Sequence, residues 1–242
     1  MNRNRFIWRW MLVGVVLWGW GTPAHATQWG RTTPGLVQDE MRIGFGLQSS
    51  SFDGWLTVPG VNTYWRGLWI DDVVALWELG LDANSTLQVQ AGIGIITMGP
   101  SDTAVGLQAG LGYMHRINRT PQLLQGWVQS LGGENLEVGV VGSFRTGDGS
   151  SGTTYAWFYE VNLGASASAQ FGNLLGYAQL HYVSVWGGEE SLTSAYYATF
   201  ASATPVGVVL GAEIPLGDGR NLSGELRLIS EFSLGLTYKL PF

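Results

Sequence analysis

The residues that end the chain, Phe232 to Phe242, read Phe-Ser-Leu-Gly-Leu-Thr-Tyr-Lys-Leu-Pro-Phe. Apolar side chains recur at every second position, which is the period of a β-strand, because successive strand side chains point to opposite faces. The apolar face consists of Phe232, Leu234, Leu236, Tyr238, Leu240 and Phe242. A tilted strand needs about 9–11 residues to cross a membrane. The ending therefore predicts a strand with one face in lipid.

This ending resembles the C-terminal signature of bacterial outer-membrane β-barrel proteins, in which hydrophobic residues alternate back from a terminal phenylalanine. Tyr238, Leu240 and Phe242 occupy the matching positions. Pro241 departs from the pattern, because proline removes a backbone donor from a strand that must close the barrel. The resemblance implies recognition by the barrel-assembly machinery during insertion. The alternative is an edge strand that ends the sheet of a soluble protein.

The other end of the chain has the features of a secretory signal over residues 1–26. Arg3 and Arg5 form a basic start, residues 10–20 are mainly apolar, and Ala24-His25-Ala26 fits the small-residue cleavage pattern. The apolar stretch is shorter than the roughly 20 residues of a membrane-spanning helix. We therefore expect a cleaved signal and one integral domain over residues 27–242, in the outer membrane of a diderm bacterium.

Composition excludes several function classes. Removing Arg3, Arg5 and Arg9 with the signal takes the formal net charge from −6 to −9, which disfavours nucleic-acid binding. The chain has no cysteine, so disulfides, thiolate catalysis and thiolate metal sites are all excluded. We expect no cofactor and assign no metal site. Charged residues make up 12% of the chain, against roughly 25% in a soluble domain, so much of the surface is expected to avoid water.

Ten segments, the last one included, show this alternation. They are residues 41–47, 75–81, 87–95, 105–113, 136–140, 155–163, 178–182, 206–214, 222–228 and 232–242. We predict an all-β, antiparallel, up-and-down transmembrane β-barrel of ten strands, with eight as the alternative. The resemblance places both chain ends on the periplasmic side, which requires an even strand count.

The charged residues within these segments fall on the opposite face from the apolar sets. They are Glu40, Arg42, Glu78, Glu137, Arg145, Glu160, Glu213, Glu225, Arg227 and Lys239. A lysine or arginine facing lipid at mid-membrane costs about 2–4 kcal/mol, whereas one facing the lumen can be paired. We therefore predict a lumen charge network from Glu40 to Arg227. The glycines on this face predict a small, strongly curved barrel with a filled interior, and an open water channel is the alternative.

One connection changes to the helical period. Leu124, Trp127, Val128 and Leu131 are spaced as one helix face, and Gly132-Gly133 follows as a stop. With Thr120 as N-cap and Pro121 at the first position, this predicts a short periplasmic amphipathic helix near 121–131. It lies either at the inner membrane interface or under the barrel mouth.

The longest predicted outer loop, residues 49–72, combines aromatic and acidic side chains that are typical of contact surfaces. The recognition candidates are Phe52, Trp55, Tyr64, Trp65, Asp71 and Asp72. Expected partners are outer-membrane lipids, including lipopolysaccharide, while the sequence specifies no oligomeric state.

These sequence features are compatible with two classes of function. The first is a non-enzymatic barrel for envelope integrity, surface interaction or limited, porin-like passage of small solutes. The second is a barrel enzyme that modifies lipids or peptides, for which His181 or carboxylates of the outer loops are the candidates. No serine or acid is arranged with His181 in a local triad, although Glu160 is expected on the neighbouring strand. We therefore predict that the protein is not an enzyme.

Overall fold

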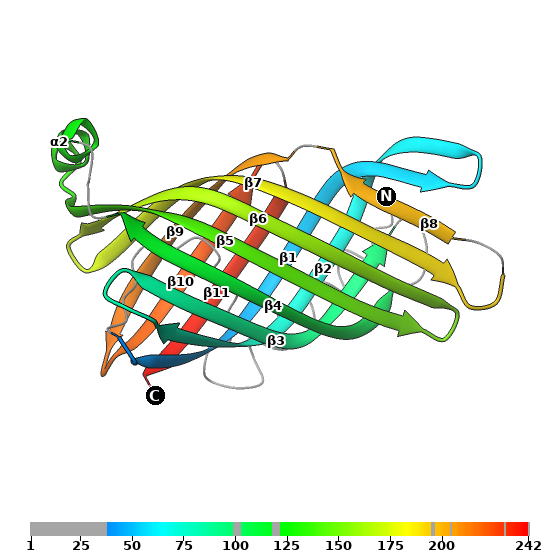
Figure 1. Ribbon diagram of the computed structural model, residues 1–242, viewed down its shortest axis with the longest axis horizontal. Helices are drawn as coiled ribbons and strands as arrows, with labels where there is room; N and C mark the ends of the chain where they lie inside the picture. Colours follow the sequence, from blue (N-terminus) through cyan, green and yellow to red (C-terminus); the bar gives the residue numbers. More distant parts are fainter. Residues whose placement is uncertain are drawn as a thin grey trace.

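The computed structural model describes residues 38–98, 103–117, 122–194, 197–203, 205–229 and 231–241. Within these ranges the chain forms one antiparallel sheet that closes on itself, and one short helix at its side (Figure 1). The expected signal at residues 1–26, the terminal Phe242 and the helix start at Thr120 and Pro121 lie outside the described residues.

The strands are long, and most neighbours in sequence are also neighbours in the sheet. Their bounds are β1 (Met41–Val58), β2 (Val61–Gly80), β3 (Ser85–Met98), β4 (Ala104–Ile117), β5 (Glu134–Ser151), β6 (Thr154–Phe171), β7 (Leu174–Ser191), β8 (Tyr197–Ser202), β9 (Val206–Gly217), β10 (Arg220–Leu228) and β11 (Glu231–Pro241). The helix is α2 (Gln122–Ser130) and connects β4 to β5. We call the end with Asp39 and Pro241 the inner end and the opposite end the outer end.

The ring contains different numbers of strands at its two ends. At the inner end β7 pairs with β9, and β11 closes on β1 from Arg42–Pro241 to Phe52–Glu231. This ring has ten strands, as predicted. At the outer end β8 pairs with residues 186–190 of β7 and residues 54–57 of β1. It thereby joins β7 to β1 above β9, β10 and β11, so the outer ring has eight strands.

The outward faces of the strands carry the apolar side chains that the alternation predicts. Ile93, Leu107 and Leu180 are 59%, 69% and 61% exposed, and all point away from the lumen. A closed antiparallel ring satisfies its backbone hydrogen bonds internally, and an apolar exterior suits it to hydrocarbon. The fold is therefore a transmembrane β-barrel. Within the described residues no helix is long and apolar enough to span a membrane.

The prediction of an outer loop at residues 49–72 is wrong. β1 continues to Val58 and β2 starts at Val61, so only Pro59 and Gly60 separate them. The strands were underestimated because Ser49, Ser51 and Asp53 replace apolar residues on the outward face. β5 and β7 likewise continue beyond the segments predicted at 136–140 and 178–182, to Ser151 and Ser191.

Local chemistry explains the ends of individual elements. In the β2–β3 turn the Asn84 backbone N–H donates to Asp82 Oδ1 at 2.7 Å, which lowers the pKa of that carboxyl. The helix α2 is followed by Gly132 at φ +79°, a left-handed conformation that favours glycine after a helix. Val128 packs on Leu136 and Ala169 and fixes α2 to the inner end of the barrel.

Candidate functional site: the lumen and the outer hairpin

The outer part of the lumen is filled by apolar side chains. They are Phe52, Leu56, Leu68, Ile70, Ile96, Met98, Ala104, Ala156, Phe158, Val183, Val185, Ala198 and Phe200. Each is buried, and they form one continuous cluster. The cluster lies toward the end where the ring has eight strands, so a small number of large side chains is enough to fill the cross-section. We call it the apolar plug.

A layer of ion pairs lies next to the apolar plug, toward the inner end. Arg145 Nη1 donates to Asp72 Oδ2 at 2.8 Å, and Arg145 Nε donates to Glu160 Oε2 at 2.9 Å. Arg227 Nη1 lies 3.6 Å from Glu160 Oε1, and Arg227 Nε donates to Glu225 at 2.6 Å. These five residues come from β2, β5, β6 and β10. They link opposite parts of the wall across the lumen.

The members of this ion-pair layer have almost no accessible surface. Arg145 and Arg227 are each 1% exposed, and Asp72, Glu160 and Glu225 do not exceed 5%. The Tyr177 hydroxyl adds a hydrogen bond to Glu225 Oε2 at 3.0 Å. Solvent therefore has almost no access to the middle of the lumen. The plug and the ion-pair layer together close the barrel.

Closer to the inner end, a second buried pair joins the first and last parts of the chain. Lys239 Nζ donates to Glu78 Oε1 at 2.6 Å, and Gln88 Nε2 donates to the same oxygen at 3.3 Å. Here glycines make space for long polar side chains on neighbouring strands. A Cβ atom at Gly110 would meet the Gln90 amide, and one at Gly164 would meet the Gln179 amide. The inward glycines thus accommodate a filled lumen.

The structure separates the predicted lumen charges into groups. Arg145, Glu160, Glu225 and Arg227 meet in one layer, while Glu78 pairs with Lys239. The remaining predicted charges lie elsewhere on the inward faces. Glu213 is buried on β9, Glu40 lies 3.7 Å from Arg42 near the inner rim, and Glu137 lies 2.7 Å from Arg116 there.

Asp72 is a lumen residue that the sequence analysis assigned to an outer loop. Asp72 and Glu78 are an even number of positions apart on β2, so their side chains lie on the same face of the strand. This spacing could have identified Asp72 as a lumen residue. Asp71 points to the other face, where Ser49 Oγ donates to its Oδ1 at 2.5 Å. The assignment of Phe52 to an exposed loop is also wrong, because Phe52 belongs to β1 and is fully buried in the apolar plug.

The hairpin of β1 and β2 extends at the outer end of the barrel (Figure 1). It presents an aromatic pair. Trp55 and Tyr64 lie opposite each other on the two strands, with ring centroids 5.6 Å apart in an edge-to-face arrangement. Each is 48% exposed, and Tyr64 Oη donates to Asp53 Oδ2 at 3.4 Å. The predicted aromatic residues therefore lie on strands rather than in a loop. The side chain of Trp65 is not among the described ones.

One edge of this outer hairpin is open within the described residues. β2 pairs with β3 only from Leu68 inwards, so residues 61–66 pair only with β1 in the described ranges. An unpaired strand edge offers backbone N–H and C=O groups to a further strand. The outer hairpin thus combines exposed aromatic rings with an open edge.

The two described histidines occupy different environments. His181 is 2% exposed on the inward face of β7, opposite Gly164 of β6. His115 lies near the inner end, where its Nδ1 is 3.0 Å from Ser85 Oγ. Among the described residues no cluster of three histidines or carboxylates has the arrangement of a metal site.

Comparison with known proteins finds similarities to solved structures only at low sequence identity. No protein-family profile and no curated protein matches the chain by sequence. The outer membrane protease OmpT of Escherichia coli is similar with a TM-score of 0.47 at 10% identity, over 87% of this chain and 100% of that one. Ail, the attachment invasion locus protein of Yersinia pestis, gives 0.35 at 10% identity, over 84% and 100%.

The translocator domain of the autotransporter NalP of Neisseria meningitidis gives a TM-score of 0.39 at 12% identity, over 98% of this chain and 96% of that domain. The chain resembles these outer-membrane barrels and is assigned to none of their families.

Proposed function

We propose that this protein is a closed, non-enzymatic outer-membrane barrel that contributes to envelope integrity and displays the β1–β2 hairpin for surface contact. The observation that carries the proposal is the filled lumen. The apolar plug and the ion-pair layer follow one another along the barrel axis, and the side chains of both are buried. Solute passage would require both to rearrange, at a large cost in desolvated charge.

The placement of the candidate catalytic groups supports a non-enzymatic role. A general base must come within hydrogen-bond reach of its substrate, directly or through one water. His181 and Glu160 are each 2% exposed inside the wall, so a substrate in the surrounding medium does not reach them. The accessible outer hairpin is instead equipped for contact through Trp55 and Tyr64.

A conductance experiment tests the closed barrel. Purified protein is inserted into planar bilayers, with heat-modifiable gel migration as the check on folding. We expect no stepwise current from the unmodified protein. Discrete steps that change size when Glu160 is replaced by Gln would mean that ions pass the ion-pair layer, and the proposal would be wrong.

A separate experiment tests the contact role of the outer hairpin. Attachment of bacteria carrying the protein to a protein-coated surface is compared with attachment of bacteria carrying Trp55→Ser/Tyr64→Ser. Buried contact aromatics often contribute 2 kcal/mol or more, so we expect at least about a tenfold loss. Tyr197→Ser on β8, where the residue is 54% exposed, is the matched control. Equal attachment by all three strains would exclude the hairpin as the contact surface.

A further inference from the structure

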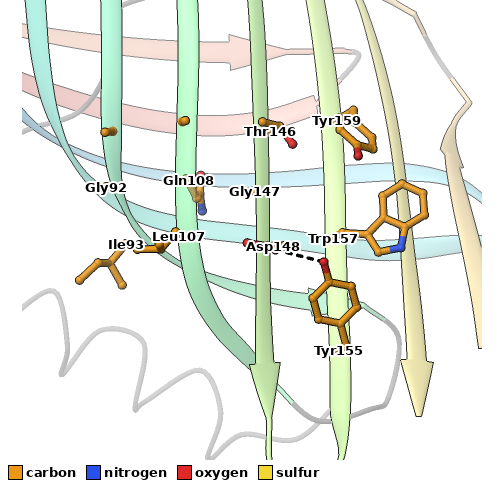
Figure 2. Close-up of a pocket in the computed structure, with 12 residues that line it drawn as sticks. Gly92, Ile93, Leu107, Gln108, Thr146, Gly147, Asp148, Tyr155, Trp157 and Tyr159 are labelled. Carbon is orange, nitrogen blue, oxygen red and sulfur yellow. Dashed lines mark hydrogen bonds between the residues drawn. The ribbon is translucent and has the colours of Figure 1, made fainter. Parts of the chain in front are cut away.

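A groove crosses the outward face of four strands on the side of the barrel (Figure 2). It has a volume of about 980 Å³ and is lined by residues of β3, β4, β5 and β6. Most of the lining side chains, among them Ile93, Leu107 and Trp157, point away from the lumen, so the groove opens toward the surroundings of the barrel. It is separate from the apolar plug, the ion-pair layer and the outer hairpin.

The groove exists because a row of small residues lies between two rows of large ones. Ala91, Ala109 and Thr146 are in register across β3, β4 and β5 and form the floor. Ile93 and Leu107 form the next row toward the outer end and are 59% and 69% exposed. The row on the inner side is Val89, Leu111 and Phe144. Rows two residues apart on a strand lie about 7 Å from each other, so the floor can hold an extended hydrocarbon chain.

The outer end of the groove is polar and aromatic. Tyr155 Oη donates a hydrogen bond to Asp148 Oδ2 at 3.0 Å, as the dashed line in Figure 2 marks. Asp148 is exposed, so its carboxylate can accept further hydrogen bonds. Trp157 and Tyr159 form the flank on β6, with ring centroids 5.4 Å apart. Tryptophan and tyrosine in such a position are typical of the interface between hydrocarbon and head groups.

We propose that this groove binds one glycolipid of the surrounding leaflet. Its acyl chain lies on Ala91 and Ala109, and a sugar of its head group donates hydroxyl hydrogen bonds to Asp148 beside Tyr155. A concavity in the hydrocarbon-facing wall has to be filled by lipid, because an empty one forfeits dispersion contacts. The polar end selects the head group. A carboxylate accepts hydrogen bonds from neutral hydroxyls and repels a phosphate, while the aromatic rings of Tyr155 and Trp157 present flat faces to a sugar.

This inference rests on the membrane location within the proposed function, and it is independent of the closed lumen and of the hairpin contact. The protein in detergent micelles is titrated with three lipids of identical acyl chains, and adducts are counted by native mass spectrometry. The probes are a monoglucosyl diacylglycerol, phosphatidylethanolamine and phosphatidylglycerol. We expect one glycolipid to be retained at least about tenfold more tightly than either phospholipid.

Three variants locate the binding. Ala109→Phe fills the floor and should abolish the glycolipid adduct. Asp148→Ala should retain lipid but lose the preference for the sugar. Ala178→Phe, at an exposed outward alanine on β7, is the matched control and should bind as the unmodified protein does. Heat-modifiable migration checks that each variant folds.

Three outcomes would overturn the proposal: equal retention of the three lipids, preference for phosphatidylethanolamine, or an unchanged adduct in Ala109→Phe. None of them depends on conductance or attachment, so failure here leaves the proposed function standing.

Discussion

Arg145 shows why a buried charge in this lumen is a specific structural link. Its guanidinium pairs with Asp72 on β2 and Glu160 on β6 while it is 1% exposed itself. Buried pairs often add little stability over apolar residues, because desolvation offsets the Coulomb attraction. Removing one partner is different, since the other charges stay buried without compensation. The role of Arg145 is therefore to fix β2 against β6.

We predict that Arg145→Ala lowers the free energy of unfolding by about 3–5 kcal/mol, because Asp72 and Glu160 lose their shared partner. Arg116→Ala is the control, since Arg116 and Glu137 form a partly exposed pair whose loss should cost about 1 kcal/mol or less. Urea unfolding in detergent micelles measures both. Similar losses in the two variants would contradict the special position of Arg145.

Gly211 provides a second test at the residue scale. A Cβ atom there would overlap the ring of Tyr177, whose hydroxyl bonds to Glu225. Gly211→Ala should cost about 1–3 kcal/mol through overpacking. At Gly224, on the outward face of β10, a Cβ atom would only come within 3.3 Å of a flexible Leu236 methyl. Gly224→Ala should therefore change the unfolding free energy by less, and the reverse order would refute the filled lumen at this point.

Among the secondary-structure elements, α2 has a neutral sequence and an apolar exposed side. It contains no charged residue, and Leu123 and Trp127 are 90% and 64% exposed while Val128 holds the helix to the barrel. Figure 1 shows α2 beside the inner end of the strands. Leucine and tryptophan on one side and glutamine on the other are typical of helices that lie in a membrane interface.

Spin labels can test this location, because the chain has no native cysteine. A nitroxide on Leu123→Cys should collide more often with oxygen than with a water-soluble nickel complex when the protein is in lipid vesicles. A label on Gln125→Cys should show the opposite preference, since Gln125 belongs to the polar side of the helix. Equal nickel accessibility at both positions would place α2 in water under the barrel mouth.

For the whole molecule, the eight-stranded outer ring can be trapped chemically. Thr57 of β1 and Thr199 of β8 are directly paired, and directly opposed Cβ atoms in a sheet are about 4.5–5.5 Å apart. Thr57→Cys/Thr199→Cys should therefore form a disulfide on mild oxidation in membranes. Ser51→Cys/Thr199→Cys, with its first cysteine further down β1 where β11 is the partner, should not. Absence of the Thr57–Thr199 cross-link would mean that β8 does not bridge the ring.

The alternation of side chains predicts much of this architecture and misses the rest for physical reasons. The alternation correctly predicted that Arg145, Glu160 and Arg227 face the lumen, because a charged side chain on the outward face would meet lipid. It failed at Phe52 and Asp72, because the wall there carries polar outward residues and no longer alternates strongly. β8 was missed because its six residues have little apolar contrast and pair over a short distance with strands remote in sequence. The meeting of charges from β2, β5, β6 and β10 depends on such remote pairings.

The bridge made by β8 has a consequence for the order of assembly. Residues 41–202 contain every strand of the outer ring, so the distal mouth can seal without help from the C-terminal hairpin. The last two strands, β10 and β11, then only have to enter a gap that is already framed by β9 and β1. The junction between β1 and β11 forms only the inner part of the wall, from Arg42–Pro241 to Phe52–Glu231. The hairpin of β10 and β11 would therefore be the last part of the barrel to insert.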